Sequence, residues 1–321
     1  MQVRILFWAL QFSICHSVVL RPMNDQPQPH SAQDRASLQV PSIMRRTAQL
    51  SQRISTALAA KIAWRWFLTP YPFKIPKRER PMEERFGAPE HFTHPRGLTY
   101  PVYTLGTGPK YILFVHGWGG RFTQFTALLD HCEAQNSNFL AEHTLIGFNA
   151  LAHRGAQGKR TMMPEFSECI QQIQERYGTF HSIIAHSLGC NAALYAQMEC
   201  GTTADHQILI APPGLISGMV GLFCDAVGFN AKVHGRIIAN LKKIHGEDFD
   251  SFSAPGLAAR NTIPALVFHD LNDNDTPIAM GRSVGENLTH GTFIETKGLG
   301  HRRILRDPNV LSQIYSFIFT A

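Results

Sequence analysis

From Leu98 to the C-terminus, short apolar segments alternate with longer segments of helical periodicity, and this alternation constrains the fold more than any other feature of the chain. Alternating strands and helices are typical of a parallel sheet that helices cover on both faces. We expect strands at residues 98–104, 111–115, 144–149, 181–185, 207–210, 265–268 and 292–295. The predicted fold class is therefore α/β, with a mostly parallel central sheet flanked by helices.

Two of the intervening helices have clear start and stop signals. The first is expected to open at Pro164, because proline suits the first turn of a helix, and to stop at Gly178. The second, near the C-terminus, is expected to begin at Pro308 after a capping Asp307.

The alternation breaks once, between residues 211 and 263, where two helices joined near Gly228 replace the expected strand. An insertion at this place lies over the carboxyl edge of a parallel sheet, so we expect a small helical lid at about residues 212–262. Its apolar residues suit either an acyl pocket or the burial of the lid helices themselves: Ile216, Met219, Leu222 and Phe223.

Residues 1–46 are expected to form a disordered leader and linker, because residues 23–41 are rich in Pro, Gln, Ser and Asp and have little to bury. Arg4 and the apolar run at 5–12 resemble a signal peptide, but no A-x-A cleavage site follows, and the run is too short for a membrane span. A leader, or initiation at Met23, is preferred over an export or anchor signal. The expected location is cytoplasmic, with membrane association or export as the alternative.

Residues 47–97 are interpreted as an amphipathic helix followed by a proline-rich basic lead-in. The helix, residues 48–68, has an apolar side chain at every fourth position: Leu50, Ile54, Leu58 and Ile62. Its aromatic C-terminal end suits a membrane interface: Trp64, Trp66 and Phe67. Packing of this helix on the body of the protein is preferred, and peripheral membrane contact through residues 48–68 is the alternative.

The composition is that of a globular protein, with 44% hydrophobic and 17% charged residues. The net charge is +6, and we assign the excess to residues 74–85, as a solvated basic face with no nucleic-acid partner. The six cysteines include no CxxC pair, which argues against a zinc site and a disulfide scaffold and favours reduced thiols. We expect no metal and no cofactor, and leave the oligomeric state open.

Four motifs follow predicted strands, and their joint occurrence carries the functional argument. The first is a buried strand that leads into His116-Gly117-Trp118-Gly119-Gly120. Glycines there let the backbone approach a bound carbonyl, so the N–H of Trp118 is a candidate oxyanion donor. A tight turn without further function is the alternative.

The second motif is Ala185-His186-Ser187-Leu188-Gly189, at a junction of strand and helix. A serine hydroxyl becomes a nucleophile when it is exposed, strained and beside a base, and a sharp strand-to-helix turn supplies exposure and strain. Such a turn needs small neighbours, here Ala185 and Gly189, in a variant of the G-x-S-x-G elbow. Ser187 is therefore the candidate nucleophile and the N–H of Leu188 the second oxyanion donor, with a helix-capping serine as the alternative.

The third motif, residues 269–277, holds three carboxylates. Asp275 or Thr276 is expected to cap a helix that starts at Pro277, and Asp270 is expected to hydrogen-bond within the turn. Asp273 is left to accept a hydrogen bond from a histidine.

The fourth motif is Gly298-Leu299-Gly300-His301, between the last strand and the final helix. Flexible glycines allow the imidazole to reach toward a serine. The chain has 16 histidines, and His301 is distinguished by its strand-end position and by the order Ser, Asp, His along the chain. It is the candidate general base.

With these motifs the chain resembles the α/β-hydrolase family from about Leu98 to the C-terminus, roughly two thirds of its length. It looks most like a group of bacterial hydrolases that share its 116–120 turn, Gly-Lys-Arg-Thr at 158–161, the 185–189 motif and residues 298–307, with a similar lead-in at 67–78. The resemblance implies a catalytic triad of Ser187, Asp273 and His301, with Trp118 and Leu188 as the oxyanion hole. The group's Asp-x-Pro-x-His-Gly is replaced here by Asn-Ala-Leu-Ala-His-Arg at 149–154.

The expected activity is hydrolysis of a carboxylic ester in a small-molecule acyl substrate, through an acyl-enzyme on Ser187. Ser187 excludes related enzymes that need a carboxylate nucleophile, whereas thioesterase, peptidase and carbon-carbon bond hydrolase stay compatible with the triad. A silent member of the fold that binds a lipid or a protein is the alternative from another class. Residues 155–161 lack the glycine spacing of a P-loop.

Overall fold

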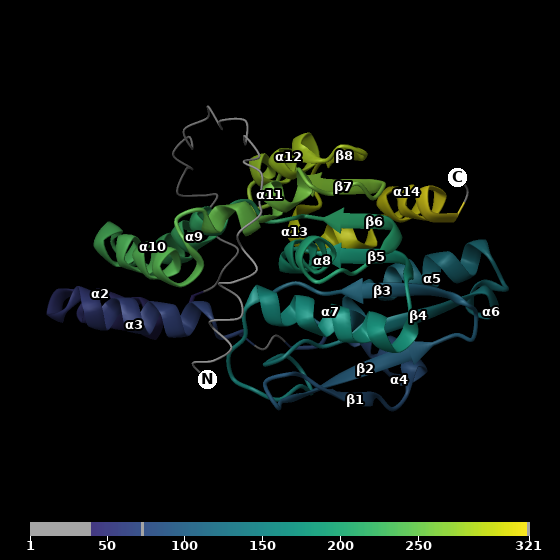
Figure 1. Ribbon diagram of the computed structural model, residues 1–321, viewed down its shortest axis with the longest axis horizontal. Coiled ribbons are helices and arrows are strands. Elements are labelled where there is room, and N and C mark those ends of the chain that lie inside the picture. Colours follow the sequence, from purple (N-terminus) through teal and green to yellow (C-terminus); the bar gives the residue numbers. More distant parts are fainter. Residues whose placement is uncertain (1–39, 72–73, 320–321) are drawn as a thin grey trace. The chain divides into compact units, whose positions relative to one another are not determined.

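An eight-stranded sheet forms the centre of the computed structural model, which describes residues 40–71 and 74–319, all within one compact unit (Figure 1). The strands are β1 Glu90–Thr93, β2 Thr99–Leu105, β3 Lys110–Val115, β4 His143–Phe148, β5 Phe180–His186, β6 Ala204–Ile210, β7 Ala265–Asp270 and β8 Gly291–Thr296. Their order is β1-β2-β4-β3-β5-β6-β7-β8, which Figure 1 shows from bottom to top. β1, β2 and β4 pair antiparallel, and every pair from β4 to β8 is parallel.

All seven predicted strands are confirmed, and the sequence analysis missed only β1 among the described strands. β1 is a four-residue edge strand in which only Phe92 is half-buried. A strand this short and exposed has no apolar alternation to predict it. Its pairing with β2 makes it a strand.

Helices cover both faces of the sheet, as predicted. Alternate residues of a strand point to opposite faces, so Leu113 and Val115 of β3 enter one core and Ile112 and Phe114 the other. The first core includes residues of four helices: α7 Met163–Tyr177, α8 Leu188–Glu199, α11 Ala254–Ala258 and α12 Ile278–Asn287. The second core also includes residues of four helices: α4 Arg80–Phe86, α5 Thr126–Gln135, α6 Phe139–Glu142 and α14 Pro308–Phe319.

The predicted helix boundaries at α7 and α14 are confirmed. Gly178 follows α7 with φ 104°, a conformation that glycine adopts without a side-chain clash. Asp307 Oδ1 accepts hydrogen bonds from the N–H groups of Asn309 (3.0 Å) and Val310 (3.2 Å), and so caps α14.

The insertion between β6 and β7 is helical, as predicted. It contains α9 Ile216–Val227 and α10 Ala231–His245, followed by the short turn η3 Phe249–Phe252 and by α11. Gly228 ends α9 in the left-handed conformation, at φ 91°. Ile216, Met219, Leu222 and Phe223 of α9 are all half-buried.

The predicted helix over residues 48–68 is wrong in its extent. The structure has two helices there, α2 Ser42–Ile54 and α3 Thr56–Phe67. Ser55 separates them because its backbone is extended and its Oγ accepts a hydrogen bond from the N–H of Leu58 at 3.4 Å, which caps α3. α2 also begins at Ser42, inside the segment 1–46 that we predict to be disordered.

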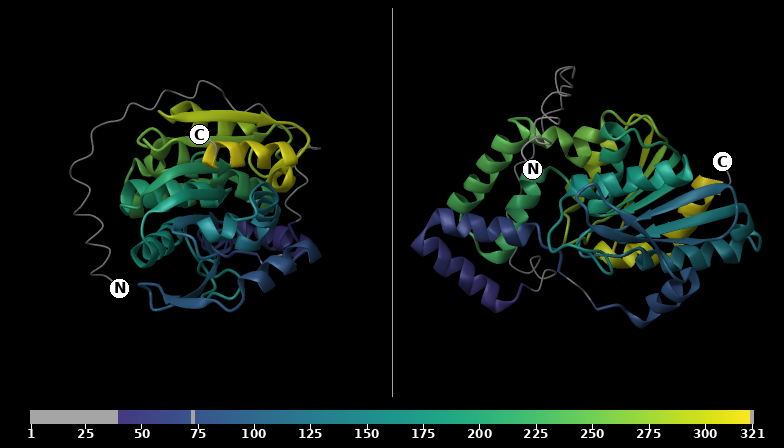
Figure 2. Two further views of the ribbon diagram at one scale, coloured as in Figure 1. Left: turned by 90° about the vertical axis from the view of Figure 1, so that its right-hand side faces the viewer. Right: turned by 60° about the horizontal axis from the view of Figure 1, so that its bottom comes forward.

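The face of α2 and α3 that packs is also not the predicted one. Four small residues share a buried cluster with residues of α9 and α10: Ala48, Ala59, Ala60 and Ala63. Figures 1 and 2 show α2 and α3 beside α9 and α10. Small side chains let helices approach closely, whereas three residues of the predicted apolar stripe are exposed: Leu50, Ile54 and Leu58.

The aromatic end of α3 packs on the helical insertion between β6 and β7. Trp66 lies against Phe229, with ring centroids 6.0 Å apart, and Phe67 lies against Phe223 at 5.4 Å. The preferred interpretation, packing of this region on the body of the protein, is therefore confirmed, although through a different face. Phe223 therefore helps to bury the helices of the insertion.

The predictions for residues 1–39, which concern the leader, the linker and the signal peptide, lie outside the described residues. No helix within residues 40–71 and 74–319 is long and apolar enough to cross a membrane. The five cysteines of this part of the chain form no disulfide: Cys132, Cys169, Cys190, Cys200 and Cys224.

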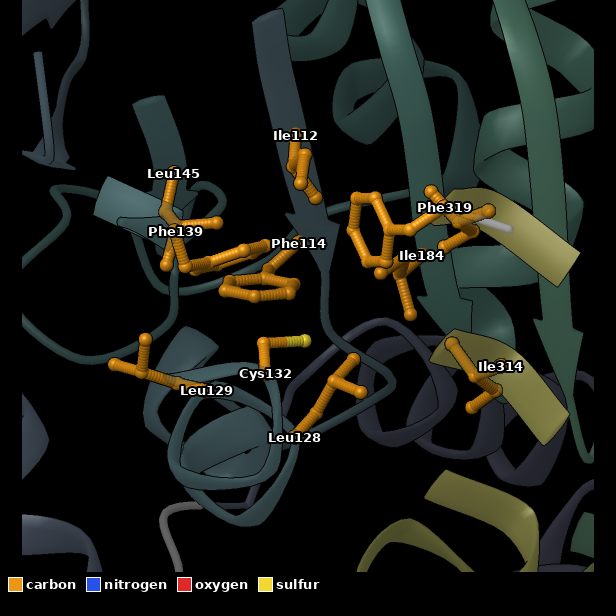
Figure 3. A pocket seen from close by; sticks show the side chains of 11 residues that line it. Ile112, Phe114, Leu128, Leu129, Cys132, Phe139, Leu145, Ile184, Ile314 and Phe319 are labelled. Atoms are coloured by element: carbon orange, nitrogen blue, oxygen red, sulfur yellow. The ribbon is translucent and has the colours of Figure 1, made fainter. Parts of the chain in front are cut away.

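A small apolar pocket lies within the second core (Figure 3). Side chains of β3, β4, β5, α5, α6 and α14 line it, among them Phe114, Cys132 and Ile314. Ile112 and Phe114 belong to the strand of the first motif, but none of the eleven lining residues is a candidate site residue or lies in one of the four turns. The pocket is therefore a packing feature of the core.

Candidate active site

The carboxyl ends of the parallel strands bring the four sequence motifs to one edge of the sheet. Val115 at the end of β3 is paired with Ala185 of β5. His186 of β5 is paired with Ile210 of β6, which in turn is paired with Phe268 of β7. The turns after β3, β5, β7 and β8 therefore lie at the edge where α/β sheets bind their ligands.

Ser187 occupies a sharp turn between β5 and α8. Its φ of 53° and ψ of −126° are strained for a residue with a side chain, and only two other non-glycine residues of the described chain have a positive φ. The N–H of Ser187 donates to Ile210 O at 2.9 Å, which fixes the turn to β6. The Ser187 side chain makes no capping hydrogen bond at the start of α8. The helix-capping alternative is therefore wrong.

Two glycines make room for this turn. A Cβ on Gly189 would lie 2.4 Å from Val115 O, so glycine is required for α8 to pass the end of β3. A Cβ on Gly117 would lie 2.8 Å from the Cβ of Ser187. The turn after β3 thus lies directly against Ser187.

His301 and Asp273 are brought together, as expected. His301 lies in the short helix α13 Gly300–Arg303, and its Nδ1 is 2.7 Å from Asp273 Oδ2. Asp273 Oδ1 accepts hydrogen bonds from the N–H groups of Asp275 (2.9 Å) and Thr276 (2.8 Å). Burial raises the pKa of Asp273, but the bonds to His301 and Thr276 lower it by more, so the net pKa lies below its ordinary value. Asp273 is thus held as a carboxylate.

The expected helix cap at Asp275 or Thr276 is wrong. α12 begins at Ile278, with Pro277 in the capping position and no side-chain cap. The Thr276 hydroxyl instead donates to Asp273 Oδ2 at 3.1 Å. The cap is absent because the helix begins one residue later than predicted, which puts Pro277, a residue without a capping side chain, in the capping position.

Asp270 has a role that the sequence analysis did not find. Its predicted bond within the turn is confirmed, from the Asn272 N–H to Oδ1 at 2.9 Å. In addition, Oδ1 accepts the N–H of Gly300 (2.9 Å) and Oδ2 accepts the N–H of Leu299 (3.0 Å). Burial raises the pKa of Asp270, but these hydrogen bonds lower it below its ordinary value. Asp270 therefore anchors the loop that carries His301.

His301 also contacts the residue that precedes Ser187. The His301 carbonyl accepts a hydrogen bond from His186 Nε2 at 2.8 Å, and the two imidazole centroids are 4.7 Å apart. Within the described part of the chain, Ser187 Oγ forms no hydrogen bond with His301. The structure thus brings His301 beside the turn and leaves the hydroxyl of Ser187, a half-buried residue, unpaired. Such hydrogen bonds commonly tighten only when substrate binds.

Two backbone N–H groups at this edge have no acceptor. Among the described residues, neither Trp118 N–H nor Leu188 N–H donates a hydrogen bond. Leu188 is the first residue of α8, where N–H groups lack helical partners and the helix dipole favours negative charge. Leu188 directly follows Ser187 in the chain, and Trp118 directly follows Gly117, the glycine that lies against Ser187.

Two buried histidines brace the turn after β3, and the sequence analysis missed both. His153 Nε2 accepts the N–H of Gly119 at 3.0 Å, and His116 Nε2 accepts the N–H of Ala150 at 3.1 Å. Burial lowers the pKa of His153 to about 4 and that of His116 well below its ordinary value, so both rings are neutral acceptors. His153 belongs to the loop at residues 149–154, which differs from the sequence of the similar hydrolases but keeps their histidine. That retained histidine was the sequence signal for its role.

The loop at residues 149–154 is held by hydrogen bonds, although it lacks the Asp-x-Pro-x-His-Gly sequence of the similar hydrolases. Asn149 Oδ1 accepts the N–H of Phe122 at 3.2 Å. Ala152 takes φ 62°, and its N–H donates to Gln157 O at 2.9 Å.

No cluster of three or more His, Cys, Asp or Glu residues within residues 40–71 and 74–319 could hold a metal ion.

No family model and no curated protein matches the chain in sequence. Solved structures are similar to it in fold. An esterase from Exiguobacterium antarcticum aligns over 72% of this chain and 99% of its own, with a TM-score of 0.55 and 12% identity. A monoacylglycerol lipase from Paleococcus ferrophilus aligns over 69% of this chain and 98% of its own, with a TM-score of 0.51 and 18% identity. A serine hydrolase from Cycloclasticus zankles aligns over 72% of this chain and 97% of its own, with a TM-score of 0.53 and 12% identity. Together with the mostly parallel sheet and its flanking helices, these likenesses show that the chain has the α/β-hydrolase fold.

Proposed function

We propose that the chain is a serine hydrolase that cleaves a carboxylic ester, with Ser187 as nucleophile, His301 as general base and Asp273 as the residue that orients His301. The observation that carries the proposal is the strained backbone of Ser187, at φ 53° and ψ −126°, with a hydroxyl that caps no helix. Strain without a structural benefit is typical of a functional position.

The chemistry follows from the groups around this turn. Ser187 Oγ attacks the acyl carbonyl while His301 Nε2 removes its proton, and the resulting imidazolium is stabilised by Asp273 at 2.7 Å from Nδ1. The carbonyl oxygen becomes negative and accepts hydrogen bonds from the N–H groups of Trp118 and Leu188. The proton then passes from His301 to the leaving alcohol, and the acyl group stays on Ser187.

Water completes the cycle. His301 removes a proton from the water, which attacks the acyl carbon, and the Ser187 oxygen leaves and regains the proton. The neutral state of His153 supports this scheme, because its Nε2 accepts from Gly119 N–H and so fixes the turn that contains Trp118. Esterases and lipases among the structures of similar fold are consistent with ester hydrolysis.

A fluorophosphonate probe tests the proposal, because it labels only an activated serine. We expect the wild-type chain to be labelled and to hydrolyse p-nitrophenyl acetate or butyrate, and Ser187→Ala to lose both. Ser137→Ala, which changes an exposed serine in a loop, is the matched control and should leave both intact. Equal hydrolysis by wild type and Ser187→Ala would remove Ser187 from its role. A wild-type chain that the probe does not label would favour a silent binding protein instead.

A further inference from the structure

Large apolar side chains line the outer face of α2. Ile43, Leu50 and Ile54 are 67%, 60% and 76% exposed. Their spacing of seven and four residues places them on one side of the helix. Leu58 at the start of α3 is 43% exposed. Single exposed apolar residues are ordinary on a protein surface, whereas a stripe of them marks a binding surface.

The orientation of α2 is fixed, so this face cannot turn inward. Gln52 Nε2 donates to Gly228 O at 3.2 Å, and Gln52 Oε1 accepts the N–H of Asn230 at 2.8 Å. Both bonds attach α2 to the connection between α9 and α10. Ala48, on the side of α2 away from the apolar stripe, is fully buried. The pair of helices α2 and α3, called the hairpin below, thus buries its small residues and exposes its large apolar residues.

The same hairpin is strongly basic. Residues 42–67 include five basic and no acidic residues: Arg45, Arg46, Arg53, Lys61 and Arg65. All five are exposed, and none of them forms an ion pair with another described residue. The predicted charge excess at residues 74–85 is wrong, because that stretch holds three glutamates beside its five basic residues. Two of these pair elsewhere, Glu79 with Arg121 and Glu83 with Arg154.

We propose that α2 and α3 form a docking surface for membranes that contain anionic phospholipids. An amphipathic helix that lies in a membrane interface needs an apolar face to insert and basic side chains that reach the phosphates. α2 supplies both, because Arg46 and Arg53 lie along one edge of the stripe of Ile43, Leu50 and Ile54. A nucleic acid would use the charges and leave the apolar stripe in water, so the observations favour a lipid surface.

The docking surface adjoins the lid. α3 packs on α10, and residues of α2 and α3 share a buried cluster with α9. The segment leading into α9 lies against α12, since a Cβ on Gly214 would be 2.8 Å from the Met280 side chain. α12 follows the loop that holds Asp273. A docked membrane would therefore lie beside the lid of the candidate site.

Vesicle flotation with the full chain tests the proposal. We expect binding to mixed vesicles of phosphatidylcholine and phosphatidylglycerol, weak binding to phosphatidylcholine alone, and release at about 1 M salt, where the Debye length is about 3 Å. The double variant Arg46→Gln/Arg53→Gln should bind about 25-fold more weakly, from about fivefold for each charge removed. Leu50→Ser/Ile54→Ser should lose about tenfold or more for each side chain.

Matched controls change the same residue types elsewhere. Leu271→Ser alters an apolar residue that is 41% exposed, and Lys110→Gln/Arg306→Gln removes two exposed charges. Both should bind as wild type does, and circular dichroism should show every variant folded. Ser187→Ala should also bind as wild type, because docking does not depend on the proposed hydrolysis. Vesicle binding by a chain without esterase activity would therefore leave the docking proposal standing.

Three results would overturn the proposal. Equal vesicle binding by Leu50→Ser/Ile54→Ser and wild type would remove the apolar stripe from the interaction. Binding to a DNA duplex that this variant retains, without vesicle binding, would assign the basic residues to nucleic acid. A dimer in light scattering that this variant dissociates, again without vesicle binding, would assign the face to a second copy of the chain.

Discussion

Replacing Ser187 with glycine should stabilise the protein while abolishing hydrolysis. A backbone at φ 53° and ψ −126° costs a residue with a side chain roughly 1–3 kcal/mol, and glycine avoids this strain. The larger conformational entropy of glycine in the unfolded chain offsets about 0.5–1 kcal/mol of the gain. The Ser187 side chain makes no capping bond, so little else is lost. The net gain in the free energy of unfolding should be about 0.5–2 kcal/mol.

Urea unfolding of Ser187→Gly and Ser187→Ala measures this difference. Ser187→Ala keeps the strain and should stay within about 0.5 kcal/mol of wild type. Ser55, which begins α3 with an extended backbone and a side-chain cap, supplies the control: Ser55→Ala should cost about 1 kcal/mol, and Ser55→Gly should bring no gain. The reasoning fails if Ser187→Gly is no more stable than Ser187→Ala.

Two further predictions concern the residues that hold the loops of the site. Asp270→Asn leaves at least one backbone N–H of the His301 loop without an acceptor, so it should lower the free energy of unfolding by about 1–3 kcal/mol. It should also lower kcat on the order of a hundredfold, because His301 loses its position. Unchanged ester hydrolysis would contradict this prediction, and Asp248→Asn, which changes an exposed aspartate, is the control. His153 has a pKa of about 4 in the folded chain against 6.5 ordinarily, so the unfolded chain binds the proton first and stability should fall by roughly 3 kcal/mol as pH falls from 6.5 to 4. His153→Phe should flatten that part of the pH dependence of urea unfolding and lower kcat about tenfold, because Gly119 loses its acceptor; an unchanged slope would show that His153 does not titrate in this way.

The alternation of strands and helices could be predicted from the sequence because periodicity is a local property. Each buried strand of a parallel sheet is a continuous apolar run, so β3 and β7 are recognisable without their neighbours. The turn motifs are local as well, since Gly189 and the strained Ser187 satisfy the steric needs of one turn. The order of Ser187, Asp273 and His301 along the chain then follows from the order of the strands.

What could not be predicted depends on contacts between distant residues. Asp270 and Asp273 are three residues apart with similar neighbours, and only the return of the chain at Leu299 and Gly300 makes one an anchor and places the other at His301. The amphipathic pattern over residues 48–68 shows that α2 and α3 have two unlike faces, but which face is buried depends on the surface that α9 and α10 present. Close helix packing favours the small side chain of Ala59 there, so the larger Leu50 and Ile54 stay outside.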